Sequence, residues 1–305
     1  MKTLIRKMSL YLPVGGLLVI LGAGTLSAFV LLSPARTWDS DPTIIVDQRG
    51  LASINDGDGG ATRTVNAIVS SSAWNGTLAG TVINAQKGDV TGISQGDGTP
   101  MLTFTDPFGA CTGSCLAATF INQYSQRSDG SYRITDADVI TNTSHQWTSQ
   151  GEDPNGSGCS NEYYVEGVMV HEAGHVLGVD HSSVPGATMQ PTTGACNNSW
   201  ATTETDDREA ILCLYRQTRL NGSGSTFAGR RFADLIWDVR CPTTASANVD
   251  IFRDGVKIVT TSNGGGYSEM FFSSATSANY WVCKAGSTTW YETATCSTVI
   301  TVFFE

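Results

Sequence analysis

Basic residues are scarce in this sequence. Only 18 of its 305 residues are Lys or Arg, against 28 Asp or Glu, so the formal net charge is −10 at pH 7. The basic side chains form no cluster beyond the extreme N-terminus, and a chain of this charge repels a phosphate backbone. We therefore exclude nucleic acid as a partner.

Charged residues of both signs are few. They make up 15% of the chain, while hydrophobic residues make up 40% and glycine contributes 33 residues. Disordered proteins have the opposite balance, so this composition indicates a globular, turn-rich protein. The length of 305 residues predicts about two domains.

The N-terminus has the pattern of an export signal. Basic residues within the first seven positions precede an apolar stretch at residues 8–32. We expect residues 1–35 to be a signal peptide cleaved after Ala35, with cleavage after Ala28 as the second choice. An uncleaved membrane anchor is the alternative, because the stretch is long enough to span a bilayer. The protein is then secreted, or it contacts the membrane through this anchor with the rest of the chain outside the cytoplasm.

Paired CxxC units are absent, which argues against a cysteine-ligated metal. Behind an export signal, the even count of eight cysteines favours disulfide bonds. Spacing alone leaves their connectivity open. The pairs that we expect are Cys111–Cys115, Cys159–Cys196, Cys213–Cys241 and Cys283–Cys296.

The chain changes character near residue 220. Up to about Arg219 it mixes strand-like and helix-like segments, whereas the later part alternates apolar and polar residues as an all-β unit does. The Gly/Ser stretch at 221–225 predicts a flexible linker. We therefore expect a first domain at residues 36–219, a linker at 220–226 and an all-β domain at 227–305.

Apolar periodicity and turn residues place the main elements of the first domain. Short apolar runs bounded by Asp, Gly, Pro or Asn predict strands, and longer segments without a helix breaker predict helices. The expected strands are 43–46, 101–105, 116–121 and 137–141, and the expected helices are 64–72, 162–177 and 204–215. In the second domain, Asp254-Gly255 between alternating apolar residues predicts a hairpin.

The stretch from His171 to His181 matches HExxHxxGxxH at every specified position. On a helix, His171 and His175 lie one turn apart on the same face and present two imidazoles to one ion. Gly178 can adopt the left-handed conformation that ends the helix and returns His181 as a third ligand. Three histidines leave the fourth position of a zinc ion open, as in catalytic zinc sites.

Glu172 has no coordination role in this motif. We expect it to act as general base for a water molecule that one catalytic Zn²⁺ activates, which hydrolyses a peptide bond without a covalent intermediate. A bare HExxH can arise by chance on an amphipathic helix. Here three of the chain's four histidines fall at ligand positions, and we expect the fourth, His145, to lie outside the site.

The motif, together with 181–185 and Met189-Gln190-Pro191, resembles the metzincin clan of zinc peptidases in its matrixin (matrix metalloproteinase-like) branch. The resemblance implies an α+β fold, with a twisted, mostly parallel sheet and long helices. It also implies that Met189 is an apolar floor beneath the zinc and that Pro191 lies in a wall of the pocket for the residue after the scissile bond. An aspartate of the pair Asp206-Asp207 would brace the methionine turn.

The stretch 116–120 resembles the edge strand along which matrixin substrates lie extended. The resemblance therefore implies a monomeric, secreted metalloendopeptidase that binds a protein or peptide segment by β-addition. The chain departs from the family at Ala118, where a histidine of a second zinc site is missing, so we expect no second zinc. The cysteine-containing propeptide of the family is also missing. Calcium is an optional second cofactor, with acidic candidates at Asp136, Asp138, Glu152 and Asp153, or at Asp56 and Asp58.

The last part of the chain resembles a fibronectin type III module, a small β-sandwich, with Trp237 in its second strand and 280–283 late in the sandwich. This leaves an alternative from another functional class. In it, the protein is a surface binding or adhesion protein and its zinc site is structural. A zinc hydrolase with non-peptide substrates is a third possibility.

Overall fold

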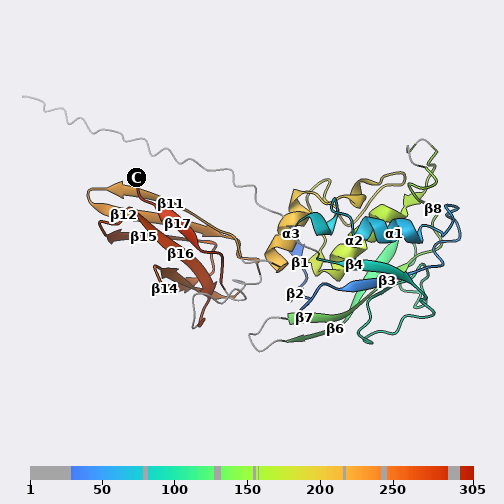
Figure 1. The fold of residues 1–305 in the computed structure, drawn as a ribbon, viewed down its shortest axis with the longest axis horizontal. Helices are drawn as coiled ribbons and strands as arrows, with labels where there is room; N and C mark the ends of the chain where they lie inside the picture. Colours follow the sequence, from blue (N-terminus) through green and yellow to red (C-terminus); the bar gives the residue numbers. More distant parts are fainter. Residues whose placement is uncertain are drawn as a thin grey trace, which may run out of the picture.

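The computed structural model describes residues 29–77, 82–126, 132–153, 156, 158–215, 218–241, 246–287 and 296–305. The expected export segment lies outside the described residues as far as residue 28. Within the described ranges, no helix has the length and apolar character that a bilayer crossing requires. Figure 1 shows a mixed helix and strand unit beside a unit made of strands.

The strands of the first unit are β1 (Val30–Leu31), β2 (Arg36–Thr37), β3 (Thr43–Asp47), β4 (Asn84–Gly88), β5 (Met101–Leu102), β6 (Ala117–Gln126), β7 (Tyr132–Thr141), β8 (Trp147–Thr148), β9 (Tyr163–Tyr164) and β10 (Val179–Asp180). The main sheet has the order β2-β7-β5-β3-β4, and all of these neighbours are parallel. Strand β6 pairs antiparallel with β7, and its other edge pairs with no strand in the part of the chain that the structure describes. The expected α+β class with a mostly parallel sheet is confirmed for this unit.

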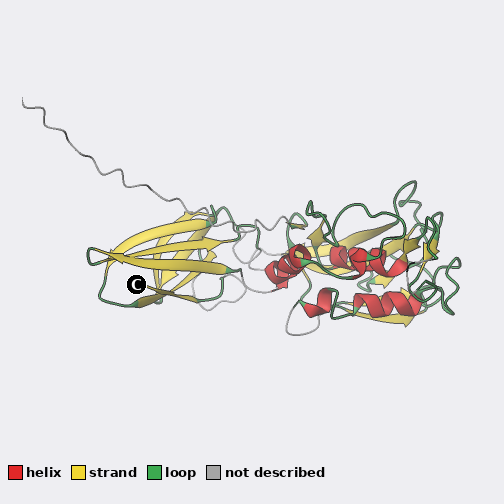
Figure 2. Ribbon diagram, turned by 90° about the horizontal axis from the view of Figure 1, so that it is seen from above, coloured by secondary structure: helices red, strands yellow, loops and turns green. Residues whose placement is uncertain are grey.

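The helices of this unit are α1 (Ala61–Ile68), α2 (Val165–Val176) and α3 (Thr205–Tyr215), with the short 3-10 helices η1 (Trp74–Gly76) and η2 (Ser199–Ala201). Figure 1 shows the three α-helices on one side of the sheet, and Figure 2 shows them from that side. Helix α2 is buried along nearly its whole length. Because it is covered on every side, it shows no amphipathic stripe.

The expected helix at 204–215 agrees with α3, but the other two helices were placed inaccurately. Helix α1 begins earlier than expected, because carboxylates of Asp56 and Asp58 accept the amide hydrogens of Gly60 and Thr62 and so initiate the helix. Helix α2 starts only at Val165, since the two preceding residues form β9 and pair with β8. Local side-chain bonds and strand pairing thus set boundaries that apolar periodicity does not encode.

Residues 29–32 belong to the folded first unit. Phe29 is buried in the main core, and β1 pairs antiparallel with β10. The amide of Leu32 also donates to the carbonyl of Gly178 at 3.1 Å. The first unit therefore begins before residue 36, where the boundary was expected, because residues 29–32 are part of it. Cleavage after Ala35 would remove β1, whereas cleavage after Ala28 would retain it.

The second unit consists of two antiparallel sheets, in the orders β11-β12-β15 and β14-β13-β16-β17. Its strands are β11 (Leu220–Phe227), β12 (Arg230–Trp237), β13 (Asn248–Arg253), β14 (Val256–Ser262), β15 (Gly266–Phe272), β16 (Ser277–Lys284) and β17 (Ile300–Phe303). Side chains from both sheets, among them Leu235, Val249, Tyr280 and Val302, share one core. The expected hairpin is confirmed, with Asp254 (φ 48°) and Gly255 (φ 87°) forming the turn between β13 and β14.

The linker expected at residues 220–226 is wrong. These residues form β11, which pairs along its whole length with β12. Their glycines serve close packing, because a Cβ atom on Gly224 would lie 2.3 Å from the carbonyl oxygen of Phe303. A Cβ atom on Gly222 would lie 2.8 Å from a methyl group of Val302.

All four expected disulfides are present, and no described cysteine is free. The bond Cys213–Cys241 joins α3 to the loop after β12, so it links the two units covalently. The bond Cys159–Cys196 brackets the segment that contains α2. A bond that closes such a loop removes conformational freedom from the unfolded chain.

The packing of β11 predicts different tolerance at adjacent positions. We expect Gly224→Ala to lower the free energy of unfolding by about 1–3 kcal/mol, because the new methyl group displaces the chain at Phe303. Ser223→Ala, at an exposed neighbouring position, should change it by less than about 0.5 kcal/mol. Urea denaturation of the two variants measures both. Equal tolerance at the two sites would mean that this segment behaves as a linker.

Candidate metal centre

Helix α2 and the residue after β10 bring three imidazole rings together. His171 and His175 lie one turn apart on α2, with ring centroids 4.9 Å apart. The His181 ring lies 5.3 Å from the first ring and 4.8 Å from the second. One ligand atom from each histidine lies within 4.8 Å of the other two, which is the arrangement that can hold a metal ion.

Backbone carbonyls orient two of these rings. The Nδ1–H group of His171 donates to Thr188 O at 2.7 Å, and that of His175 donates to Val179 O at 2.8 Å. Each bond leaves the lone pair of Nε2 available, and Nε2 of His175 lies 3.2 Å from Nε2 of His181. A neutral imidazole whose other nitrogen donates to a carbonyl is the usual form of a metal-ligating histidine. The residues present therefore fit a zinc ion.

The surroundings of the rings favour the neutral form that metal binding requires. Burial, followed by the neighbouring His175, lowers the pKa of His171 to about 3. The pKa values of His175 and His181 are also lowered, in each case chiefly by burial. The three rings are therefore neutral at neutral pH, and no proton has to leave before a cation binds.

Gly178 makes the turn between α2 and β10 possible. Its φ of 98° lies in the left-handed region that favours glycine. A Cβ atom there would also lie 2.4 Å from the carbonyl oxygen of Arg36, so the residue has no room for a side chain. This turn carries the chain back, so that His181 reaches the rings on α2.

Met189 is fully buried and lies close to Gly174, which stands between the two histidines of α2. Its Sδ atom would be 2.4 Å from a Cβ atom on Gly174, so the methionine packs directly against α2. Asp207 braces the methionine turn, the chain around Met189, since its carboxylate accepts the amide hydrogens of Thr188 at 2.8 Å and Met189 at 3.1 Å. Asp206 accepts the hydroxyl of Ser182 instead, at 2.6 Å. The structure thus distinguishes the two aspartates.

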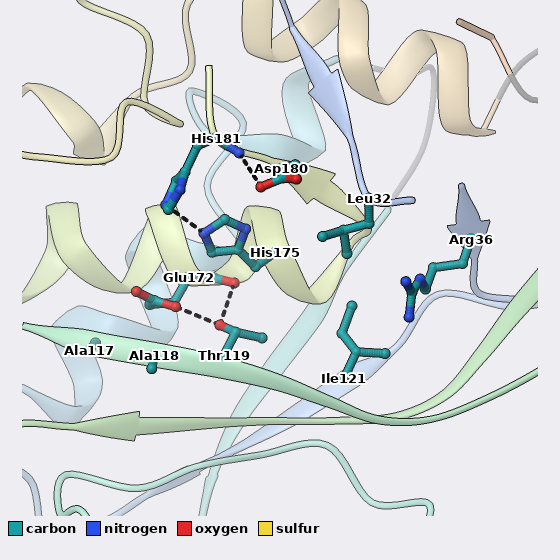
Figure 3. A pocket seen from close by; sticks show the side chains of 10 residues that line it. All are labelled: Leu32, Arg36, Ala117, Ala118, Thr119, Ile121, Glu172, His175, Asp180 and His181. Carbon is teal, nitrogen blue, oxygen red and sulfur yellow. Dashed lines mark hydrogen bonds between the residues drawn. The ribbon is translucent and has the colours of Figure 1, made fainter. Parts of the chain in front are cut away.

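Glu172 faces β6 beside the imidazole cluster. The residue is 5% exposed, and its carboxylate accepts the hydroxyl of Thr119 at 2.6 Å, as Figure 3 shows. Burial raises the pKa of Glu172 to about 7, and the bond from Thr119 opposes this shift. A carboxylate with such a pKa can both take up and release a proton near neutrality.

Two cavities flank the centre, and both are bordered by β6. A cavity of about 350 Å³ is lined by Leu32, Arg36 and Ile121 together with His175 and His181 (Figure 3). A cavity of about 490 Å³ lies next to His171 and Glu172 and is lined by Leu116, Tyr163, Val168, Pro191 and Trp200. Pro191 therefore lies in a pocket wall beside the centre.

The sequence reasoning missed three residues around the centre. Trp200 stacks on His171 with a centroid distance of 4.4 Å, and Thr119 bonds Glu172. Trp74 packs against Gly174 and donates its indole N–H to Val170 O at 2.8 Å. The strand expected at 116–121 already placed Thr119 near the site, but no local signal marks either tryptophan. His145 lies outside the cluster, with Nε2 3.0 Å from Gly113 O.

The acidic candidates for calcium fall into separate places. Asp136 and Asp138 lie on β7 and are buried, near Asn122 on β6. The other candidates have different partners, because Glu152 accepts the amide of Asn55 and Asp56 accepts the hydroxyl of Ser149. Asp153 accepts the hydroxyl of Tyr164. These hydrogen bonds therefore connect Glu152 and Asp153 to other parts of the first unit and not to the Asp136–Asp138 pair.

Comparison with protein families gives a match over part of the chain. Residues 112–216 match the family model described as Matrixin, which covers about a third of the chain. The matched region contains α2, β10, the three histidines, Met189 and α3. This match and the imidazole cluster together support a matrixin-like zinc metallopeptidase, and that family implies zinc as the metal and proteins or peptides as substrates.

The bracing of the methionine turn predicts a loss of both stability and metal affinity in Asp207→Asn. In the wild type, the two carboxylate oxygens of Asp207 accept the amide hydrogens of Thr188 and Met189. An asparagine side chain has only one acceptor oxygen, so we expect the free energy of unfolding to fall by about 2 kcal/mol. Zinc affinity should fall about tenfold, because Thr188 O orients His171. Denaturation of the metal-free protein and competition with a zinc-binding dye measure the two effects. Glu204→Gln, which changes the exposed residue just before α3, is the control and should match the wild type.

Proposed function

We propose that the protein is an exported zinc-dependent endopeptidase in which His171, His175 and His181 hold the zinc and Glu172 is the general base. The observation that carries this proposal is the convergence of three neutral imidazoles beside a buried carboxylate. A structural zinc site needs no such carboxylate. Zinc bound there would lower the pKa of a water molecule and polarise the carbonyl of a peptide bond.

The chain's own groups divide the remaining work. Glu172 takes the proton of the attacking water and passes it to the leaving amine. Thr119 holds the carboxylate in place through its bond to Oε2 at 2.6 Å. Met189 supplies an apolar floor, and the carbonyls of Thr188 and Val179 keep two rings oriented.

We propose that the substrate binds in extended form along the free edge of β6. Thr119 of β6 bonds Glu172, and residues of β6 line both cavities. Pairing along an edge strand recognises a chain segment rather than a terminus, which supports endopeptidase activity. Pro191 lines the cavity of about 490 Å³, and the matrixin resemblance puts this residue in the wall of the pocket for the residue after the scissile bond. This cavity therefore takes that residue. The cavity of about 350 Å³ then takes residues before it.

Export is supported by the four disulfides, which persist in oxidising compartments. We further propose that the second unit is a fibronectin type III-like module and that the protein acts as a monomer. The orders β11-β12-β15 and β14-β13-β16-β17 of its two sheets support the module. A surface-binding role for this module is compatible with a peptidase in the first unit.

Asp136 and Asp138 are our proposal for a calcium site. Both are buried, and Oδ1 of Asp136 has no hydrogen-bond partner among the described residues. Burial, followed by the neighbouring Asp136, raises the pKa of Asp138 to about 7. A cation that bound both carboxylates would remove this repulsion, and carboxylate oxygens are ligands that calcium prefers.

The proposed base predicts a separable defect in Glu172→Gln. We expect this variant to bind one zinc ion but to lose several orders of magnitude in kcat, because only the proton acceptor is removed. Cleavage of denatured casein and metal analysis measure the two properties, with Glu204→Gln as an active control. A zinc chelator should abolish wild-type cleavage. Cleavage that resists the chelator would exclude a zinc peptidase.

The proposed calcium site predicts a pH-dependent stability. The native pKa of Asp138, about 7, lies above its unfolded value, so the native state retains a proton that the unfolded state releases. Without calcium, the free energy of unfolding should therefore fall as the pH rises from about 4 to about 7. Calcium at neutral pH should restore it. Asp138→Asn should lose both effects, while Asp41→Asn, at an exposed position, should keep both. Denaturation at several pH values with and without calcium tests this.

A further inference from the structure

Residues 29–36 belong to the first unit and run from a contact with Arg240 to the cavity beside the metal centre. Phe29 is buried at the start of this segment, and β1 then pairs with β10, the strand between Gly178 and His181. Leu32 and Arg36 line the cavity of about 350 Å³ together with His175 and His181. Figure 3 shows their side chains on the side of that cavity opposite Glu172.

Arg240 of the second unit holds the start of the segment. Its Nη1 atom donates to Phe29 O at 2.6 Å, and its Cζ atom lies 4.2 Å from the centroid of the Phe29 ring. The guanidinium is itself oriented by Asp238, at 3.1 Å. The adjacent Cys241 is bonded to Cys213 of α3, so this loop is fastened to the first unit.

Other contacts hold the end of the segment. The guanidinium of Arg36 donates from Nε to Pro34 O at 3.1 Å and lies 4.1 Å from the ring centroid of Tyr124 on β6. Strand β2 pairs with β7. These contacts belong to the first unit, whereas the contacts of Arg240 come from the second. The cavity wall is therefore supported from both units.

We propose that residues 29–36 form the wall of the subsite for substrate residues that precede the scissile bond, and that Arg240 is a positioning residue that holds this wall. The proposal rests on the peptidase function and adds a role for the second unit. In this proposal the second unit affects substrate selection indirectly, because its Arg240 side chain holds the segment that lines the subsite. The cation–π contact and the charged hydrogen bond from one guanidinium both stabilise the start of this segment.

The test compares full-length, zinc-loaded Arg240→Ala with the wild type on two fluorogenic peptides built from a site cleaved in denatured casein. One peptide carries several residues before the scissile bond, and the other carries only one. We expect kcat/KM to fall about tenfold for the long peptide and to stay within about twofold for the short one. Arg240→Lys should recover much of the loss, since it keeps a cationic donor. Arg230→Ala is the control, because this arginine also contacts an aromatic ring, Phe272, but lies away from the segment.

Hydrogen exchange supplies a readout that does not depend on activity. The amide of Leu32, bonded to Gly178 O, should exchange faster in Arg240→Ala than in Arg230→Ala. An unchanged exchange rate would overturn the proposal, as would equal losses on both peptides. If the wild type cleaves neither peptide nor casein, the peptidase function fails and the subsite fails with it. If the wild type cleaves both and only the difference between peptides is missing, the role of Arg240 alone is refuted.

Discussion

Three imidazole nitrogens must direct their lone pairs at one position, and the structure around α2 follows from this requirement. Two rings are turned by carbonyls of Thr188 and Val179, so the chain segments that carry these carbonyls must be fixed as well. Asp207 fixes the first segment, and the turn at Gly178 together with the β1 pairing fixes the second. The metal centre thus depends on backbone carbonyls both within the motif, at Val179, and beyond it, at Thr188.

Burying α2 concentrates these constraints in one helix. The residues near its C-terminus are buried, so their carbonyl groups need hydrogen-bond donors from the protein. Side chains from distant segments supply these donors. Trp38 donates to Val176 O at 2.8 Å, and Tyr215 donates to Leu177 O at 2.8 Å. Unpaired buried carbonyls would cost stability, so these bonds also join α3 and the start of the first unit to the helix. Burial of the helix and hydrogen bonding to its last turn therefore depend on the same distant segments.

The two units are connected by more than chain continuity. A disulfide joins α3 to the loop after β12, and Arg240 in that loop reaches Phe29 at the start of the segment beside the cavity. The segment read as a linker is a paired strand, so the second unit begins almost directly after the described part of α3. Such a junction favours a defined arrangement of the two units over a flexible tether.

The sequence alone determined the residues that meet at the centre, because helical spacing and a glycine turn are local properties of the stretch from His171 to His181. The even cysteine count behind an export signal likewise predicted disulfide bonds, although not their connectivity, and an Asp-Gly pair predicted one hairpin. Tertiary structure decided what distant segments do, including the bond from Thr119 to Glu172 and the stacking of Trp200 on His171. It also decided that Gly224 lies in a packed strand, since a glycine that allows flexibility and one that allows close contact look the same until the neighbouring chain is in place.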